Sequence, residues 1–210
     1  MFLNDPMSNS GCGCSSRGME CHALGPFLAV DAACITPSQP ATGGSIIPFS
    51  SGVTPVVLTS LVNGLITTPS LIGFGTAVPG VTLVGNTLDL SGVVTEAFTV
   101  PRAGSITGLS ASFSATVAIA ALAGSTTVTA TIYRAPAGST TYTATDATVN
   151  LAPAFTGAVS LGATAFGSGS FAPVAVSAGD KLIMVYSITT TGVAVVQTLT
   201  GTASAGITIV

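Results

Sequence analysis

The feature that most constrains the fold is a strict alternation of apolar and hydroxyl-bearing residues. In residues 109–121 every odd position is apolar, and serine or threonine stands at positions 110, 112, 114 and 116. The apolar positions are Leu109, Ala111, Phe113, Ala115, Val117, Ile119 and Ala121. A period of two places these side chains on one face of a strand. We therefore predict a half-buried β-strand over residues 109–121.

Two further segments extend this prediction. In residues 127–133, Val128, Ala130 and Ile132 alternate with threonines, which indicates a second half-buried strand. By contrast, residues 182–186 are continuously apolar, which is typical of a strand covered on both faces. We expect the core to cover one face and a neighbouring subunit the other. The predicted subunit interface consists of Leu182, Ile183, Met184, Val185 and Tyr186.

Turn-forming residues separate these strands, and no amphipathic helical segment competes with them. About ten short strands joined in this way predict an all-β fold, a jelly-roll β-sandwich. The expected turns are Pro79-Gly80, Gly85-Asn86, residues 101–104, Pro136-Ala137-Gly138, Gly167-Ser168-Gly169 and Ala178-Gly179-Asp180.

Charged residues are scarce. Only 5% of the 210 residues are charged, the net charge is −3 and the mean hydropathy is +0.77. Little electrostatic repulsion keeps copies apart, so we expect self-association. Lys and Arg total four, which is too few for nucleic-acid binding. No apolar run approaches the length of a membrane span, and the first residues lack the pattern of a classical signal peptide.

The chain divides into two parts of different composition. All four cysteines and His22, the single histidine, lie within the first 34 residues. A segment rich in proline and glycine, residues 37–44, follows and is typical of a linker. We predict a cysteine-bearing N-terminal connector and linker over residues 1–44, extended as a tail, and the jelly-roll domain over residues 45–210.

The cysteines of the connector are candidates for cross-linking. Cys12, Cys14, Cys21 and Cys34, with His22, have the side-chain types of a zinc site. The spacing does not support zinc, because paired C-x2-C knuckles are absent. Disulfides are the preferred interpretation, and reduced thiols on an unstructured tail are the alternative. We expect no metal and no cofactor.

An apolar patch in the connector is the candidate docking segment. Phe27, Leu28, Val30 and Ile35 lie close together in the sequence and are costly to leave exposed. They could add to the next subunit as a strand or plug. Packing on their own domain is the alternative.

Residues 45–210 offer little for catalysis, because they contain no histidine and no cysteine. Asp89 and Glu96 could approach each other as a carboxylate pair. The favoured interpretation is that they are turn residues or partners of Arg102, so we expect a non-enzymatic protein. The other charged residues of this part are Arg134, Asp146, Asp180 and Lys181.

Several motifs resemble the C-terminal domain of Bcl-type exosporium glycoproteins of bacterial spores. They are Ile-Pro-Phe-Ser-Ser-Gly-Val-Thr-Pro-Val-Val-Leu-Thr from residue 47, Gly73-Phe74-Gly75, residues 98–107, residues 176–186 and the closing residues 203–209. The resemblance covers residues 46–210. It implies a tumour-necrosis-factor-like jelly roll that forms homotrimers on the spore surface, in an exosporium or an appendage.

One departure from that family bears on function. Its members usually carry a long Gly-x-y collagen stalk, and these 210 residues contain none. The resemblance therefore favours a structural spore-surface protein whose trimers are linked through N-terminal tails into a fibre with interchain disulfides. The alternative is a trimeric adhesin or receptor-binding knob anchored by its tail. The expected partners are further copies of the chain and an exosporium anchor protein.

Overall fold

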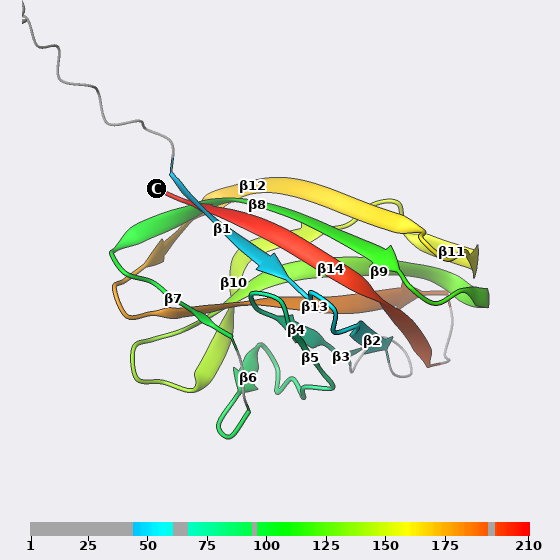
Figure 1. Ribbon diagram of the computed structural model, residues 1–210, viewed down its shortest axis with the longest axis horizontal. Coiled ribbons are helices and arrows are strands. Elements are labelled where there is room, and N and C mark those ends of the chain that lie inside the picture. Colours follow the sequence, from blue (N-terminus) through cyan, green and yellow to red (C-terminus); the bar gives the residue numbers. More distant parts are fainter. Residues whose placement is uncertain (1–43, 61–66, 94–95, 193–195) are drawn as a thin grey trace, which may run out of the picture. The chain divides into compact units, whose positions relative to one another are not determined.

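A computed structural model describes residues 44–60, 67–93, 96–192 and 196–210 of the chain (Figure 1). Within these ranges the structure is all-β, and it contains no helix that could cross a membrane. The four cysteines and the docking segment Phe27, Leu28, Val30 and Ile35 lie outside the described residues. The two-part division near Ser45 therefore stays a prediction.

The strands form two antiparallel sheets. Sheet A has the order β12 (Thr164–Val176), β8 (Gly104–Ala115), β14 (Gln197–Ile209), β2 (Val56–Ser60) and β3 (Thr67–Thr68), and β1 (Ser45–Ser50) also pairs with β14. Sheet B has the order β5 (Ala77–Pro79), β4 (Ser70–Ile72), β13 (Lys181–Thr191), β9 (Ile119–Ala135), β10 (Thr141–Asn150) and β6 (Thr87–Asp89). Two further strands join sheet B, β7 (Phe98–Thr99) on β13 and β11 (Phe155–Val159) on β9.

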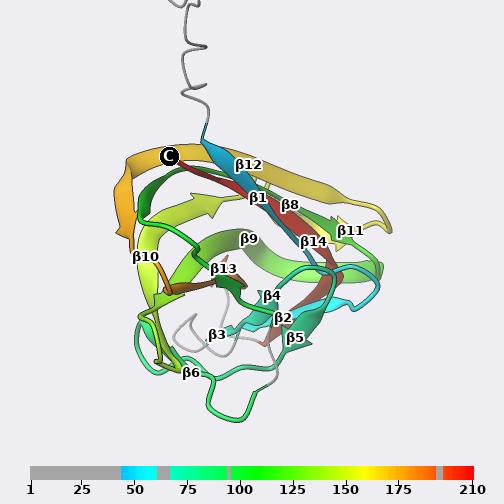
Figure 2. The same ribbon diagram turned by 60° about the vertical axis from the view of Figure 1, so that its left-hand side comes forward.

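The pairing of strands far apart in the sequence gives the fold its topology. β1 pairs with β14, β4 with β13, β8 with β12 and β9 with β10, each in antiparallel register. These four pairs are nested along the chain, which is the arrangement of a jelly roll. Figure 2 shows β12, β8, β14 and β1 side by side above β13 and β9. The predicted β-sandwich is confirmed, and the described ranges contain 14 strands where about ten were expected.

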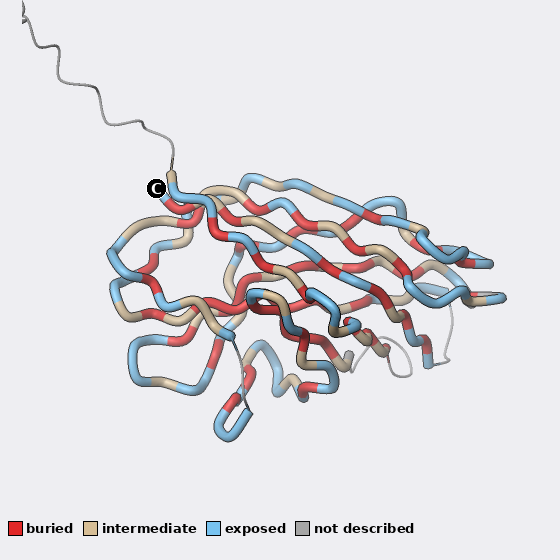
Figure 3. The backbone as a smooth tube through the Cα atoms, viewed as in Figure 1, coloured by how far each residue is buried: buried red, intermediate tan, exposed pale blue. Residues whose placement is uncertain are grey.

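The main core lies between the two sheets and follows the predicted alternation (Figure 3). On β8, Leu109, Ala111 and Phe113 are buried, and the serines between them are exposed or half-buried. On β9, the core-facing Val128, Ala130 and Ile132 are fully buried. Burial of these apolar side chains is the main favourable contribution to folding.

Two local predictions are wrong. The strand predicted over residues 109–121 ends at Ala115, and the chain crosses to the other sheet before β9 begins at Ile119. Val117, in the turn, is 50% exposed, and on β9 the core-facing residues Val128, Ala130 and Ile132 stand at even rather than odd positions. The turn predicted at Gly167-Ser168-Gly169 lies inside β12, because none of these residues needs a left-handed backbone.

The apolar strand at residues 182–186 is covered on both faces, but by its own chain. Leu182, Met184 and Tyr186 face the core between the sheets. Ile183 and Val185 join a second hydrophobic cluster on the outer face of sheet B. That cluster also contains Leu71, Val81, Leu88, Leu90, Tyr133, Ala135 and Tyr142.

This double burial corrects the predicted subunit interface. Leu182, Ile183, Met184, Val185 and Tyr186 are each at most 2% exposed within one chain. A neighbouring subunit has no access to side chains buried in this way. Segment 77–93, which includes β5 and β6, covers the outer face of this strand, where the sequence predicts a neighbouring subunit.

Candidate assembly surface

Sheet A carries no acidic or basic side chain in any of its strands. All seven charged residues of the described domain lie elsewhere, in sheet B or in loops. They are Asp89, Glu96, Arg102, Arg134, Asp146, Asp180 and Lys181. Taking an uncharged surface out of water avoids the large cost of desolvating ions. The outer face of sheet A is therefore the candidate site.

Strand register places the outward side chains of four strands in rows across this face. One row runs from Phe166 on β12 through Ser112 and Ser204 to Ser50 on β1. The next row contains Ser168, Ser110, Gly206 and Pro48, and the one after it contains Ser170, Gly108, Thr208 and Ile46. We call these three rows the serine face. Its middle is small and polar, and its two margins are apolar.

The hydroxyl groups of the serine face bond to one another across the strands. The Oγ atoms of Ser110 and Ser168 are 2.8 Å apart, and those of Ser112 and Ser204 are 2.9 Å apart. A hydroxyl that already has a protein partner loses less when water is removed from around it. The paired serines therefore lower the cost of covering this face.

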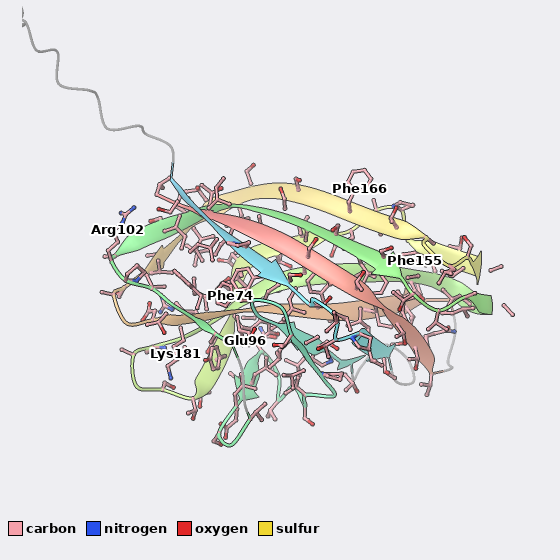
Figure 4. All side chains as sticks on the ribbon, in the orientation of Figure 1. Phe74, Glu96, Arg102, Phe155, Phe166 and Lys181 are labelled. Carbon is pink, nitrogen blue, oxygen red and sulfur yellow. The ribbon has the colours of Figure 1, made fainter. Side chains whose placement is uncertain are left out.

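Large apolar side chains stand at both margins. Phe166 is 68% exposed at the β12 margin, and Figure 4 shows it on the outer side of that strand. Ile46 is 76% exposed on β1 at the opposite margin, beside the exposed Pro48. Contact with another molecule would bury this exposed apolar area.

The middle of the serine face is hollowed. A depression of about 490 Å³ lies between Phe166 and Pro48, over Ser112, Ser204 and Gly206. A second one, of about 260 Å³, continues from it over Gly108, Ser110 and Gly206. We call the second depression the glycine hollow.

The carboxylates singled out in the sequence have local structural partners. Asp89 accepts a hydrogen bond from the backbone N–H of Ser91 at 3.0 Å, and this bond lowers the pKa of Asp89. Glu96 accepts from the backbone N–H of Phe74 at 2.8 Å. Among the described residues neither forms an ion pair with Arg102. Asp89 is the last residue of β6, and its side chain accepts a hydrogen bond from the turn that follows.

The single ion pair found in the described ranges is also structural. Arg134 Nη1 lies 3.7 Å from Asp180 Oδ2 and donates to the carbonyl of Ala175 at 2.7 Å. Asp180 also accepts from the backbone N–H of Ser177 at 2.8 Å, across the predicted turn. These contacts join β9 to the turn between β12 and β13.

No group of three or more histidine, cysteine or carboxylate side chains that could hold a metal ion occurs in the described part of the chain. The candidate cross-linking residues Cys12, Cys14, Cys21 and Cys34 lie outside that part. Sequence reasoning missed the serine face, because its residues come from four strands. The available signal was the outward Ser and Gly positions of three separate alternating segments.

A known viral protein is similar to this chain in sequence. The chain is 34% identical over 174 residues to collagen-like protein 1 of Acanthamoeba polyphaga mimivirus, with 78% of this chain aligned. The matched region covers 18% of that relative's length. No protein-family model matches the chain.

The similarity and the fold agree with each other. An all-β sandwich that is similar to a collagen-like protein fits the jelly-roll domain of such a protein, and it suggests a structural protein. The relative is viral, so the resemblance to spore exosporium proteins stays an expectation.

Proposed function

We propose that this chain is a non-enzymatic structural subunit that self-assembles into homotrimers on the bacterial spore surface. The observation that carries the proposal is the separation of charge. Every acidic and basic side chain of the described domain lies off sheet A, whose outer face has paired serines and apolar margins. Such a face favours contact with another uncharged surface of the same kind.

The connector would join trimers into a fibre. The described chain begins at Gly44, next to Ser45, which pairs with Ile209 at the end of β14. The connector is therefore joined to the domain at the first residue of β1, a strand that contributes Ile46 and Pro48 to the serine face. In this proposal Cys12, Cys14, Cys21 and Cys34 form interchain disulfides, and Phe27, Leu28, Val30 and Ile35 dock on the next copy. The exosporium, or an appendage on it, is the proposed location, with an anchor protein as a further partner.

The test uses the purified full-length chain. We expect a ladder of disulfide-linked species on non-reducing gels, collapse of that ladder with reductant, and filaments by negative-stain microscopy. A variant with all four cysteines replaced by serine is the control, and it should lose the ladder while keeping its trimers. Monomer mass on non-reducing gels together with the absence of filaments would contradict the fibre.

A second function is favoured by the collagen-like relative. Its length greatly exceeds the matched region, so the corresponding part of that protein is one piece of a longer chain. This supports the alternative of a trimeric adhesin or receptor-binding knob anchored by its tail. Binding of isolated trimers to a glycan array, without end-to-end association, would favour the knob. Any enzymatic turnover abolished by Asp89→Asn would overturn both.

A further inference from the structure

Two glycines in the middle of the serine face are not required by close contacts within their own domain. Gly108 lies beside the register shift between Thr208 and Ile209, whereas Gly206 lies in regular pairing. Gly206 and Gly108 lie in strands, and neither has the left-handed backbone that favours glycine. A Cβ added at Gly206 would meet nothing within 4 Å, and one at Gly108 would meet only Thr208, at 3.7 Å or more. Glycine within a strand costs stability relative to residues with a side chain.

At other strand glycines, close contacts within the domain leave no room for a side chain. A Cβ at Gly201, on the same strand β14, would collide with the carbonyl oxygen of Ser114 and the ring of Phe113. At Gly104 it would lie 2.7 Å from the carbonyl oxygen of Val210. Gly206 and Gly108 differ because the space above them is open and forms the glycine hollow. A strand glycine can mark a bulge or a place where another molecule approaches closely, and Gly206, which is away from any register shift, fits the second.

The edges of sheet A leave little room for an added strand. On β1, the backbone N–H of Ser50 donates to Gly73 at 2.8 Å, and its carbonyl accepts from Gly75 at 2.9 Å. Pro48, in the middle of β1, has no N–H to offer. On β12, the N–H and the carbonyl of Phe166 both bond to Ala152, each at 2.9 Å. These positions favour contact with the face over extension of the sheet.

We propose that the glycine hollow of one copy receives Phe166 of a second copy of this chain. The inference rests on the proposed self-assembly and specifies its contact surface. The occupant is a second copy because the serine face has no charge to attract a charged partner. It also carries both halves of the contact, a projecting aromatic ring at one margin and a hollow of about 260 Å³ in the middle.

The two halves lie at different places on the same face, so the contact fits either a two-fold pair, in which each copy's Phe166 enters the other's hollow, or a head-to-tail ring. The proposed homotrimer requires the ring. Phe166 and Gly206 belong to neighbouring rows and to strands separated by β8. A contact between two different patches closes into a ring when the rotation between copies permits. A ring of three copies would place every Phe166 in the hollow of the next copy. The paired serines then line the interface, with one hydroxyl of each pair donating to the other.

The test fills the hollow without disturbing the domain. Gly206→Val introduces a strand-favouring side chain into open space, so the melting temperature should be unchanged or higher. Association of the reduced full-length chain, measured by sedimentation, should weaken at least about tenfold. Phe166→Ala should weaken association similarly, and because this ring is exposed its loss leaves the core intact. Thr189→Val, on the outer face of sheet B, is the matched control and should associate as the wild type does.

The outcomes separate this inference from the proposed function. If the reduced wild-type chain sediments as a monomer at all concentrations, domain-driven self-assembly is wrong and the inference fails with it. If the wild type associates and both Gly206→Val and Phe166→Ala associate equally well, the contact surface is wrong while self-assembly stands. Loss of association in both variants, with Thr189→Val unaffected, supports Phe166 in the glycine hollow.

Discussion

At the scale of single residues, one buried tyrosine links the two sheets. Tyr186 extends from β13 in sheet B, and its hydroxyl lies 2.8 Å from the carbonyl oxygen of Ser204 and 3.1 Å from that of Ser112, both in sheet A. Burial raises the pKa of Tyr186, and also that of Tyr133, above the ordinary value of 10. Tyr186 is therefore a neutral hydrogen-bond donor throughout the physiological range.

Replacing this residue should lower stability through the lost donor. Tyr186→Phe keeps the ring but leaves the two carbonyl groups without its hydroxyl, which costs about 1–2 kcal/mol in free energy of unfolding. Because the folded pKa is raised, the tyrosine contributes fully below pH 10, and this contribution is lost as the pH rises further. Urea unfolding of wild type and variant from pH 7 to pH 11 measures both effects. A Tyr186→Phe variant as stable as wild type at pH 7 would show that the hydroxyl contributes nothing.

At the scale of elements, the segment that covers sheet B is a second layer with its own hydrophobic cluster. Leu88 on β6 is fully buried there, against residues that include Ile183 and Val185 of β13. Its neighbour Val84, four residues earlier, is 73% exposed. The cover over the outer face of β13 therefore depends on a few inward side chains of a short segment.

Shortening one of those inward side chains tests how much segment 77–93 contributes to stability. Leu88→Ala should lower the free energy of unfolding by about 2–4 kcal/mol, because it leaves a cavity in the second cluster. Val84→Ala is the matched control and should change it by less than about 0.5 kcal/mol. Thermal unfolding followed by circular dichroism gives both values. Equal stabilities of the two variants would mean that segment 77–93 adds little to the fold.

At the scale of the whole molecule, the strands of sheet A carry no charge. All seven charged groups of the described domain lie in sheet B or in loops, and Arg102 lies in the loop that leads into β8. Contact through the serine face should therefore respond to salt differently from contact between charged surfaces. Salt screens charges, and it leaves burial of apolar and paired polar groups largely unchanged.

Association of the reduced chain should change by less than about threefold between 50 mM and 500 mM sodium chloride. Sodium sulfate should strengthen it, because excluded salts favour burial. Sedimentation at matched protein concentrations provides the measurement. Dissociation as sodium chloride rises would mean that the interface includes charged residues such as Arg102, Asp146 or Lys181.

The sequence by itself determined that segments such as 109–115 and 127–133 are strands and which side of each is buried. These properties are local, since alternation at Leu109, Ala111 and Phe113 follows from the geometry of an extended chain. It also determined that the surface carries few charges. It did not reveal that Ala115 ends a strand, because the alternation continues through the turn.

Only the tertiary structure decided what covers each face. The second face of residues 182–186 is buried by segment 77–93, about a hundred positions earlier in the chain, so no local pattern distinguishes that cover from a neighbouring subunit. The serine face likewise exists only because register aligns Ser168, Ser110 and Gly206 across three strands. Register between distant strands is a long-range property, and it brought the small residues of separate segments together on one uncharged surface.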